Sequence, residues 1–472
     1  MWGIAGILPI GAILGSLSAT AGYASPFVFI AILGIVVLIT IPILEYTRLA
    51  KFAGGYYGAA ELGFGKATGK FVATTNYVYY LAWQVANATF VGSLIAVGYY
   101  AIYGTYPPVY VYFLVGSLAL LIPLIASLLN VKKVSAIVTY MTIAGFVLNF
   151  VALGLLLSHA HYFSLQQFNP SFAPGGLKGA LFSMVVYGFF TYAGYGFLLF
   201  YTEEGKQPFK NTWKAALIAL ATATVLSVVM SFAINAVFGP VRIITAIQFP
   251  QPGLLLFVKW LGAAGELFIV GFLIMLVVFS FASGVGAQGR IMYTLCRDGF
   301  VKNRWLGRLN KNQVPSNNMI FNFIITLAAF LSLGVLFIPT YGYFKSIFYM
   351  SYVPSTVATI FWYYHHIIPD LSLSAFFRRH RISLLKPRTF IISLLIPIVS
   401  AIIIIYSVYE AIIADTVEPF FAGVVLALVI SLMVLIWVAY RHLTGTIGVS
   451  SVEERLNEEA LKEMGGIVGG KE

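Results

Sequence analysis

Charged residues are scarce in this chain. Asp, Glu, Lys and Arg together make up only 9% of the 472 residues, whereas a soluble globular domain carries about 25%. Cysteine is almost absent too, since Cys296 stands alone and therefore allows no disulfide within the chain. The net charge of +12 does not indicate a nucleic-acid partner, because the Lys and Arg residues lie in short loops between apolar runs. The composition excludes an ordinary soluble protein.

Apolar residues, in contrast, reach 60% of the sequence and recur in runs of about 20 residues or more, the length that crosses a bilayer. We therefore predict an all-α polytopic membrane protein with twelve transmembrane helices. A short interfacial helix is expected at 250–260, before the eighth span. The predicted spans cover roughly residues 2–22, 26–49, 71–102, 109–129, 134–158, 179–202, 213–238, 261–287, 318–338, 342–368, 388–411 and 420–440.

The basic residues predict the orientation of these spans. With the N-terminus inside, all 28 Lys and Arg residues fall in inner loops or the tail except Lys178, Arg242, Lys259 and Lys345. Basic residues concentrate on the cytoplasmic side of membrane proteins. We predict a multi-pass protein of the cell membrane with both termini cytoplasmic and a solvated tail at 441–472.

Two spans carry glycine and hydroxyl residues where a plain spanning helix would carry Leu or Ile. The first span reads GAILGSLSATAG from Gly11 to Gly22, and the sixth reads FTYAGYG from Phe190 to Gly196. Glycine costs about 1 kcal/mol relative to alanine inside a helix, and a break at membrane depth survives only where it faces protein or a watery cavity. Either run alone is equally explained by close helix packing. Five spans separate their starting points, however, and this pairing is typical of transporters built from inverted repeats.

This symmetry predicts the division of the chain. Residues 1–158 form a first inverted repeat of helices 1–5, and 159–178 form an outer linker. Residues 179–368 form a second repeat of helices 6–10. Helices 11 and 12 at 388–440 and the cytoplasmic tail at 441–472 complete the chain.

Five short motifs in this order resemble a known family. They are Gly11 to Leu17, Glu45 with Ala53 to Tyr57, Phe189 to Tyr195, Glu204 with Gln207 to Asn211, and Arg290 with Arg297 to Gly299. Together they resemble the amino acid–polyamine–organocation (APC) superfamily of transporters over spans one to ten. The resemblance implies the LeuT-type fold of five plus five helices, with discontinuous helices 1 and 6 and two appended helices.

The sequence also departs from that pattern. Leu17 stands where the family usually has a second glycine, and Gly196 stands where many members carry a glutamate. The fifth span contains no lysine, whereas some proton-coupled relatives carry one there.

The two broken helices suit the charges of an amino acid. Exposed N–H groups at the start of a half-helix stabilise a carboxylate, and freed carbonyls stabilise an ammonium group. We assign the carboxylate to the N–H groups of Gly15, Ser16 and Leu17, with help from the Ser16 hydroxyl. Carbonyls near Ile13, Phe190 and Ala193 would meet the ammonium, and Thr191 and Gly194 complete this part of the predicted substrate site.

The third span is expected to line the side-chain pocket. Its sequence from Asn76 to Asn87 is similar to the third helix of an antiporter of this family, and the match implies that Ala82, Trp83 and Asn87 contact substrate. Ordinary packing of Trp83 and an interhelical hydrogen bond of Asn87 are equally open. Glu266 lies near the outer end of its span, so no carboxylate is expected at the depth of a cationic side chain.

These observations predict a secondary active transporter that moves neutral amino acids by alternating access. A polyamine or other organic-cation transporter of the same fold, and a non-transporting sensor, are the alternatives. We expect an amino acid substrate, contact with membrane lipid, and a proton or sodium ion as the coupling ion. Ser280 and Ser283 are sodium candidates, although two such serines more often bond to their own helix. No enzyme activity, cofactor or metal centre is predicted, because no Asp, Glu or Cys cluster converges on the histidines.

Overall fold

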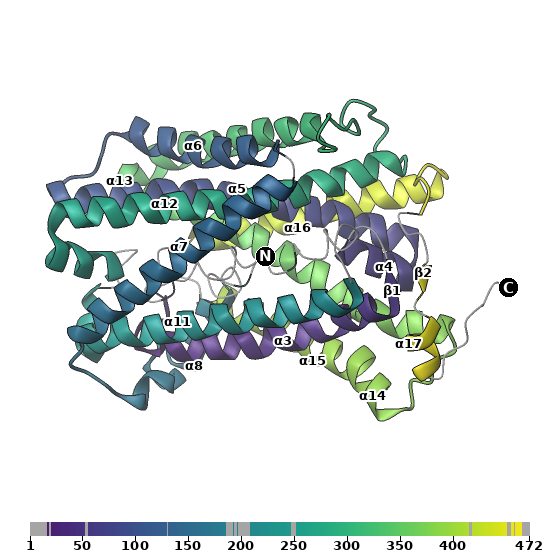
Figure 1. Cartoon of the computed structure of the whole chain (residues 1–472), viewed down its shortest axis with the longest axis horizontal. Coiled ribbons are helices and arrows are strands. Elements are labelled where there is room, and N and C mark those ends of the chain that lie inside the picture. The colour runs from purple at the N-terminus through teal and green to yellow at the C-terminus, as the bar shows by residue number, and fades with distance from the viewer. Residues whose placement is uncertain are drawn as a thin grey trace.

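A computed structural model describes residues 17, 20–51, 55–129, 131–185, 192, 196, 208–246, 252–414, 418–450, 455–456 and 458–464. Long helices run side by side along the longest axis of the molecule (Figure 1). Nine helices within the described residues are long and apolar enough to cross a membrane. The chain is therefore a polytopic helical membrane protein, as the composition predicts.

The first half of the chain alternates long helices with short connections. Its elements are η2 (Gly22–Ala24), α3 (Ser25–Leu49), β1 (Ala50–Lys51), α4 (Tyr56–Phe64), α5 (Lys66–Tyr103), α6 (Val109–Ser127), α7 (Val131–Ser158), η3 (Leu165–Phe168), η4 (Pro170–Phe172) and α8 (Leu177–Ser183).

The second half contains the longest helices. Its elements are α11 (Pro208–Ala246), α12 (Pro252–Arg297), α13 (Ser316–Arg379), α14 (Pro387–Phe390), η7 (Ile391–Leu395), α15 (Ile396–Ala414), α16 (Glu418–Leu443), β2 (Arg455–Leu456) and α17 (Glu458–Glu463).

Glycines break three of these long helices where the sequence predicts span ends. Gly239, Gly262 and Gly342 have φ of 71°, 65° and 75° inside α11, α12 and α13. Positive φ is a conformation that glycine adopts without steric cost. Gly342 divides α13 between the predicted ninth and tenth spans, and Gly262 separates the predicted short helix from the eighth. Spans one and six lie largely outside the described residues, so twelve spans and the inverted repeat stay predictions.

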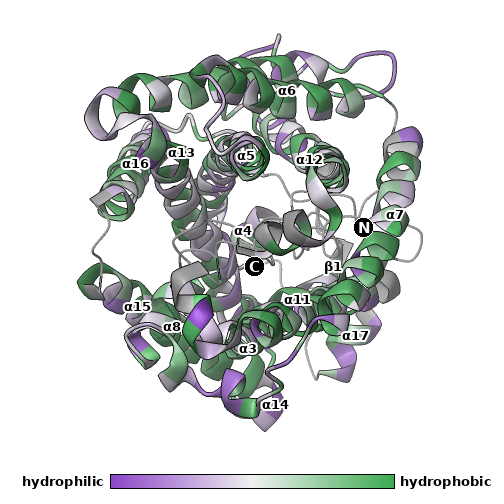
Figure 2. Cartoon of the chain, turned by 90° about the vertical axis from the view of Figure 1, so that its left-hand side faces the viewer, coloured by the Kyte–Doolittle hydropathy of each residue, from purple (hydrophilic) through white to green (hydrophobic). Residues whose placement is uncertain are grey.

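The helices α5, α12 and α13 pack together behind an apolar outer surface (Figure 2). At 38 residues, α5 is longer than a bilayer requires, as its sequence predicts. Apolar side chains on α15 and α16 point outward, where Ile405 is 66% and Ile436 is 61% exposed. This is the surface that lipid would cover.

Within the described residues, part of the tail is packed against the protein and is not solvated as its charges predict. Strand β2 pairs with β1, so that Ala50 lies opposite Leu456. Leu461 of α17 is fully buried, and Arg48 of α3 forms an ion pair with Glu463. The elements α4, β1, β2, α14 and α17 gather at one end of the molecule, on the right in Figure 1. The prediction was wrong because the few apolar residues among the charges pack against α3.

At the same end, α4 packs closely against the last turns of α13. A Cβ atom on Gly63 would lie 2.2 Å from the backbone oxygen of Ser372. The Ser372 hydroxyl also lies within 3.1 Å of the Ala59 carbonyl oxygen, and Arg379 donates hydrogen bonds to the carbonyls of Leu62 and Gly63. The close approach of the two backbones therefore depends on the absence of a side chain at residue 63.

We predict that Gly63→Ala destabilises the protein. The added methyl group must push the α13 backbone away, and overpacking of this kind costs about 1–3 kcal/mol. The melting temperature of purified protein in detergent should fall. Gly34→Ala on the exposed face of α3 is the matched control, because a Cβ there meets no atom within 4 Å. Equal melting temperatures for the two variants would contradict this packing.

Candidate functional site

The structure describes four of the predicted substrate-binding residues, namely Leu17, Ala82, Trp83 and Asn87. The other seven lie outside the described residues, and they are Ile13, Gly15, Ser16, Phe190, Thr191, Ala193 and Gly194. Leu17 is fully buried, and its carbonyl oxygen accepts a hydrogen bond of 3.2 Å from the Thr20 hydroxyl. Atomic contacts can therefore be described mainly for the part of the site that the third span forms.

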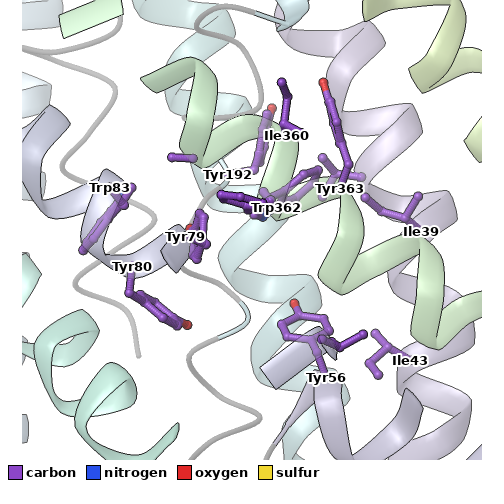
Figure 3. Packing of buried hydrophobic residues seen from close by; sticks show 14 of the residues in the cluster. Ile39, Ile43, Tyr56, Tyr79, Tyr80, Trp83, Tyr192, Ile360, Trp362 and Tyr363 are labelled. Atoms are coloured by element: carbon purple, nitrogen blue, oxygen red, sulfur yellow. The ribbon is translucent and has the colours of Figure 1, made fainter. Parts of the chain in front are cut away.

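Trp83 and Asn87 lie one turn apart on the same face of α5 and are almost completely buried. The Trp83 ring meets the ring of Phe281 of α12 edge-on, with 4.8 Å between their centroids. Ala82 is half-buried. Figure 3 shows Trp83 with Tyr79 and Tyr80 on the same stretch of α5. Aromatic rings thus gather around this part of α5.

Two asparagines of α5 are buried without hydrogen-bond partners among the described residues. Asn87 is 1% exposed and Asn76 is 0% exposed, and neither amide has a partner there. A buried amide left unsatisfied costs about 1–3 kcal/mol. Asn87 is therefore a candidate for a polar contact with a ligand. Sequence reasoning did not assign Asn76, and its only signal was an amide inside an apolar run.

The sixth-span segment is fixed to its surroundings at two described positions. The Tyr192 hydroxyl donates a hydrogen bond of 3.2 Å to the Phe29 carbonyl oxygen and lies 2.8 Å from the Thr224 hydroxyl. A Cβ atom on Gly196 would lie 2.2 Å from the hydroxyl oxygen of Tyr56. The ring of Tyr56 thus occupies the space that a side chain at residue 196 would need.

A chain of amide and phenol groups links three helices beside this site. Gln84 of α5 donates to Gln288 of α12 across 2.5 Å. Tyr77 of α5 bonds to Asn322 of α13, and Asn318 donates to the Gly289 carbonyl across 2.8 Å. Sequence reasoning missed these pairs, although amides in apolar runs commonly bond neighbouring membrane helices. They tie α5 of the predicted first repeat to α12 and α13 of the second.

A buried ion cluster joins the same two parts of the chain closer to β1. The Lys70 ammonium lies 2.8 Å from Asp298 Oδ2 and 4.0 Å from Glu61 Oε2, and it is fully buried. Ser450 donates to Glu61 across 2.6 Å, and Arg297 Nε lies 3.4 Å from Asp298 Oδ1. Lys70 is therefore not the loop charge that the sequence predicts. It lies in the first turns of α5, where two carboxylates compensate for the burial of its charge.

The described residues also bear on the question of metal sites. Within them, no three His, Cys, Asp or Glu side chains gather closely enough to hold a metal ion. The side chains of the sodium candidates Ser280 and Ser283 lie outside the described part of the structure. A sodium site therefore stays untested.

We predict that Lys70→Met lowers the free energy of unfolding by about 3–5 kcal/mol, because the change leaves Asp298 and Glu61 buried without their cation. Lys214→Met at an exposed position of α11 is the control and should have little effect. In the double variant Lys70→Met/Asp298→Leu, part of the loss should return. Melting temperatures of the variants check this, and additive losses would contradict a direct pair.

Comparison with known proteins places these features in a family. No curated protein matches the chain. The model of the amino acid permease family matches residues 3–439, and this match includes every helix from η2 to α15, most of α16 and both glycine-interrupted segments. Family membership indicates a transporter rather than an enzyme, with a small-molecule substrate. The chain belongs to the amino acid permease family, within the APC superfamily that its motifs resemble.

Proposed function

We propose that this protein is a secondary active transporter that moves neutral amino acids across the cell membrane by alternating access. The main observation behind this proposal is the buried amide of Asn87, which has no hydrogen-bond partner among the described residues and lies one turn from Trp83 on α5. Membership of the amino acid permease family supports the substrate class. In this proposal the chain has twelve spans in the LeuT-type arrangement, with both termini in the cytoplasm.

The substrate backbone binds between the first and sixth spans. An amino acid brings a carboxylate and an ammonium group, and either charge would be costly in an apolar site without partners. N–H groups at Gly15, Ser16 and Leu17 receive the carboxylate, and carbonyls at Ile13, Phe190 and Ala193 receive the ammonium. Tyr192 of the sixth span supports this proposal, because its hydroxyl donates to the Phe29 carbonyl oxygen of α3 and lies 2.8 Å from the Thr224 hydroxyl of α11.

The surroundings of Trp83 favour a neutral side chain. Glu266 is a buried carboxylic acid of α12 with no hydrogen-bond partner among the described residues. Fifteen residues separate it from Phe281, which contacts Trp83, and that spacing spans roughly 22 Å along a helix. Glu266 is therefore too far away to pair with a cation held against Trp83.

The buried polar pairs provide the closed side of an alternating-access cycle. Lys70 with Asp298 and Gln84 with Gln288 hold α5 to α12 and its C-terminal end. Opening a path at this end requires some of these contacts to break. Such contacts can be exchanged for new ones because each side chain can re-pair with water when the helices separate.

We predict that Asn87→Leu weakens amino acid binding about tenfold or more. A hydrogen bond to a buried polar group is worth about 1–3 kcal/mol, which corresponds to this range. Asn149→Leu on α7 is the matched control, since the Asn149 amide donates to its own helix at Gly145. Affinity is measured by scintillation proximity binding of a labelled neutral amino acid. Equal loss in both variants would argue against a substrate contact at Asn87.

Bulky residues at the glycine breaks test the backbone part of the site. Gly15→Leu and Gly194→Leu should abolish binding while leaving folded protein, because a side chain would cover the N–H and carbonyl groups. Gly34→Leu on the exposed face of α3 controls for the substitution itself. Size-exclusion profiles report folding, and the same binding assay reports the site. Binding retained by both variants would contradict the placement of the substrate backbone at these glycine breaks.

A further inference from the structure

Three ionisable side chains are buried together near the end of α13. His365 and His366 are 2% and 1% exposed, and Asp370 is 0% exposed. Asp370 follows His366 by one helical turn, so the two side chains lie on the same face. Ionisable groups inside membrane helices are rare and mark ion or proton pathways by default. Nothing in the substrate site described above uses these groups.

Aromatic rings from two other helices enclose the histidines. The Tyr56 ring of α4 lies 4.7 Å from His365 and 4.5 Å from His366 between centroids. The Tyr79 ring of α5 lies 4.8 Å from His365. His366 Nδ1 is 2.8 Å from the Trp362 carbonyl oxygen, which requires a proton on that nitrogen. In the neutral ring with the proton on Nδ1, Nε2 carries no proton and has the chemistry of a base.

Asp370 has no hydrogen-bond partner for either oxygen among the described residues. An ionised carboxylate in such a place costs several kcal/mol, whereas the protonated acid is neutral. Tyr46 of α3 lies near Asp370 but bonds to Ser372 across 2.8 Å. Arg379, one of two arginines in the last turn of α13, donates to the Leu62 and Gly63 carbonyls. Of the two histidines, His366 lies one turn before Asp370 on the same helix face and is its candidate proton partner.

The cluster is connected to the predicted substrate helix through Tyr56. The ring that packs on both histidines also lies against Gly196 of the sixth-span segment. If Asp370 loses its proton to His366, a neutral pair becomes a carboxylate and an imidazolium beside that ring. The change alters how Tyr56 packs, and therefore what the sixth span meets at Gly196. Figure 3 shows Tyr56 on α4 together with α13 residues of the same core.

We propose that His365, His366 and Asp370 form a proton-binding site that couples amino acid transport to the movement of a proton. This inference rests on the proposed transport function and names its coupling ion. One proton is taken up from one side of the membrane and released to the other in each cycle. Only an O–H or N–H bond forms and breaks at the cluster, so no further reactant is needed.

Glu266 is the competing carboxylic acid, because it too is buried without a partner among the described residues. It lies one turn before Val270, in an apolar cluster with Leu94 and Val97 of α5. Within the described residues, the Glu266 carboxyl group forms no hydrogen bond that would connect it to Tyr56. Glu266→Gln is therefore the matched control for Asp370→Asn, since both changes remove one buried carboxyl group.

The test uses full-length protein in proteoliposomes with a labelled neutral amino acid. Counterflow at equal pH measures exchange, accumulation under an imposed pH gradient measures coupling, and a trapped pH dye measures proton movement. Wild-type protein and Glu266→Gln should accumulate substrate several-fold when the outside is acidic. Asp370→Asn, a mimic of the protonated acid, should still exchange substrate but lose the accumulation and the dye signal. His365→Gln/His366→Gln should lose coupling as well.

The outcomes separate this inference from the function on which it rests. Counterflow without any effect of a pH gradient in wild type overturns the proton site and leaves transport standing. Coupling that survives both Asp370→Asn and the double histidine variant also overturns it, as does coupling lost only in Glu266→Gln. If Asp370→Asn fails to fold, loss or retention of coupling in the double histidine variant tests the proton site instead. Absence of counterflow for every amino acid overturns the proposed function and this inference with it.

Discussion

The bilayer interior offers no water to a polar group, and this constraint governs the whole structure. Every buried charge or amide needs a hydrogen-bonding or charged partner in the protein, because burying it without one costs free energy on the kcal/mol scale. Lys70 satisfies the constraint through Asp298, with Glu61 close by, and Gln84 satisfies it through Gln288. The helices α5, α12 and α13 consequently meet at defined positions rather than by apolar contact alone. The buried groups that have no partner among the described residues, including Asn87 and Asp370, are the candidates for function.

Buried polar side chains that have partners among the described residues differ in role from those that have none. The partnered groups join α4 and α5 to the C-terminal end of α12, and these elements come from the two predicted repeats. Ser450 extends that junction, because it bonds to Glu61 while Val449 N–H donates to the Asp298 carbonyl. Val449 and Ser450 therefore belong to the same junction as the ion cluster. In the proposed function, transport needs these contacts to exchange, and substrate and proton supply partners for the groups that have none among the described residues.

The long helices could be predicted from the sequence because apolar length is a local property. The predicted span at 26–49 matches α3, and the predicted boundary between 338 and 342 coincides with the break at Gly342. The position of Lys70 could not be predicted in this way. Its burial depends on Asp298, which is 228 residues away, and a charge count treats every lysine near a span end as a loop charge.

The C-terminal segment and the substrate site show the same limit. Residues 455–464 carry too few apolar side chains for a span, and only the surface of α3 makes Leu461 a buried residue. For the site, the similarity of the third span pointed to Trp83 and Asn87, and the structure places them on one buried face. Gln288 and Tyr56 were not assigned to the site because each acquires its importance from a contact on another element.

The proposed transport of neutral amino acids is tested by uptake of labelled amino acids into proteoliposomes. Neutral, cationic and acidic amino acids and polyamines serve as competitors. We expect saturable uptake that neutral amino acids inhibit and that polyamines do not. Inhibition by polyamines or cationic amino acids alone would contradict the neutral site next to Trp83. No uptake of any panel member by folded protein would contradict the proposed transport itself.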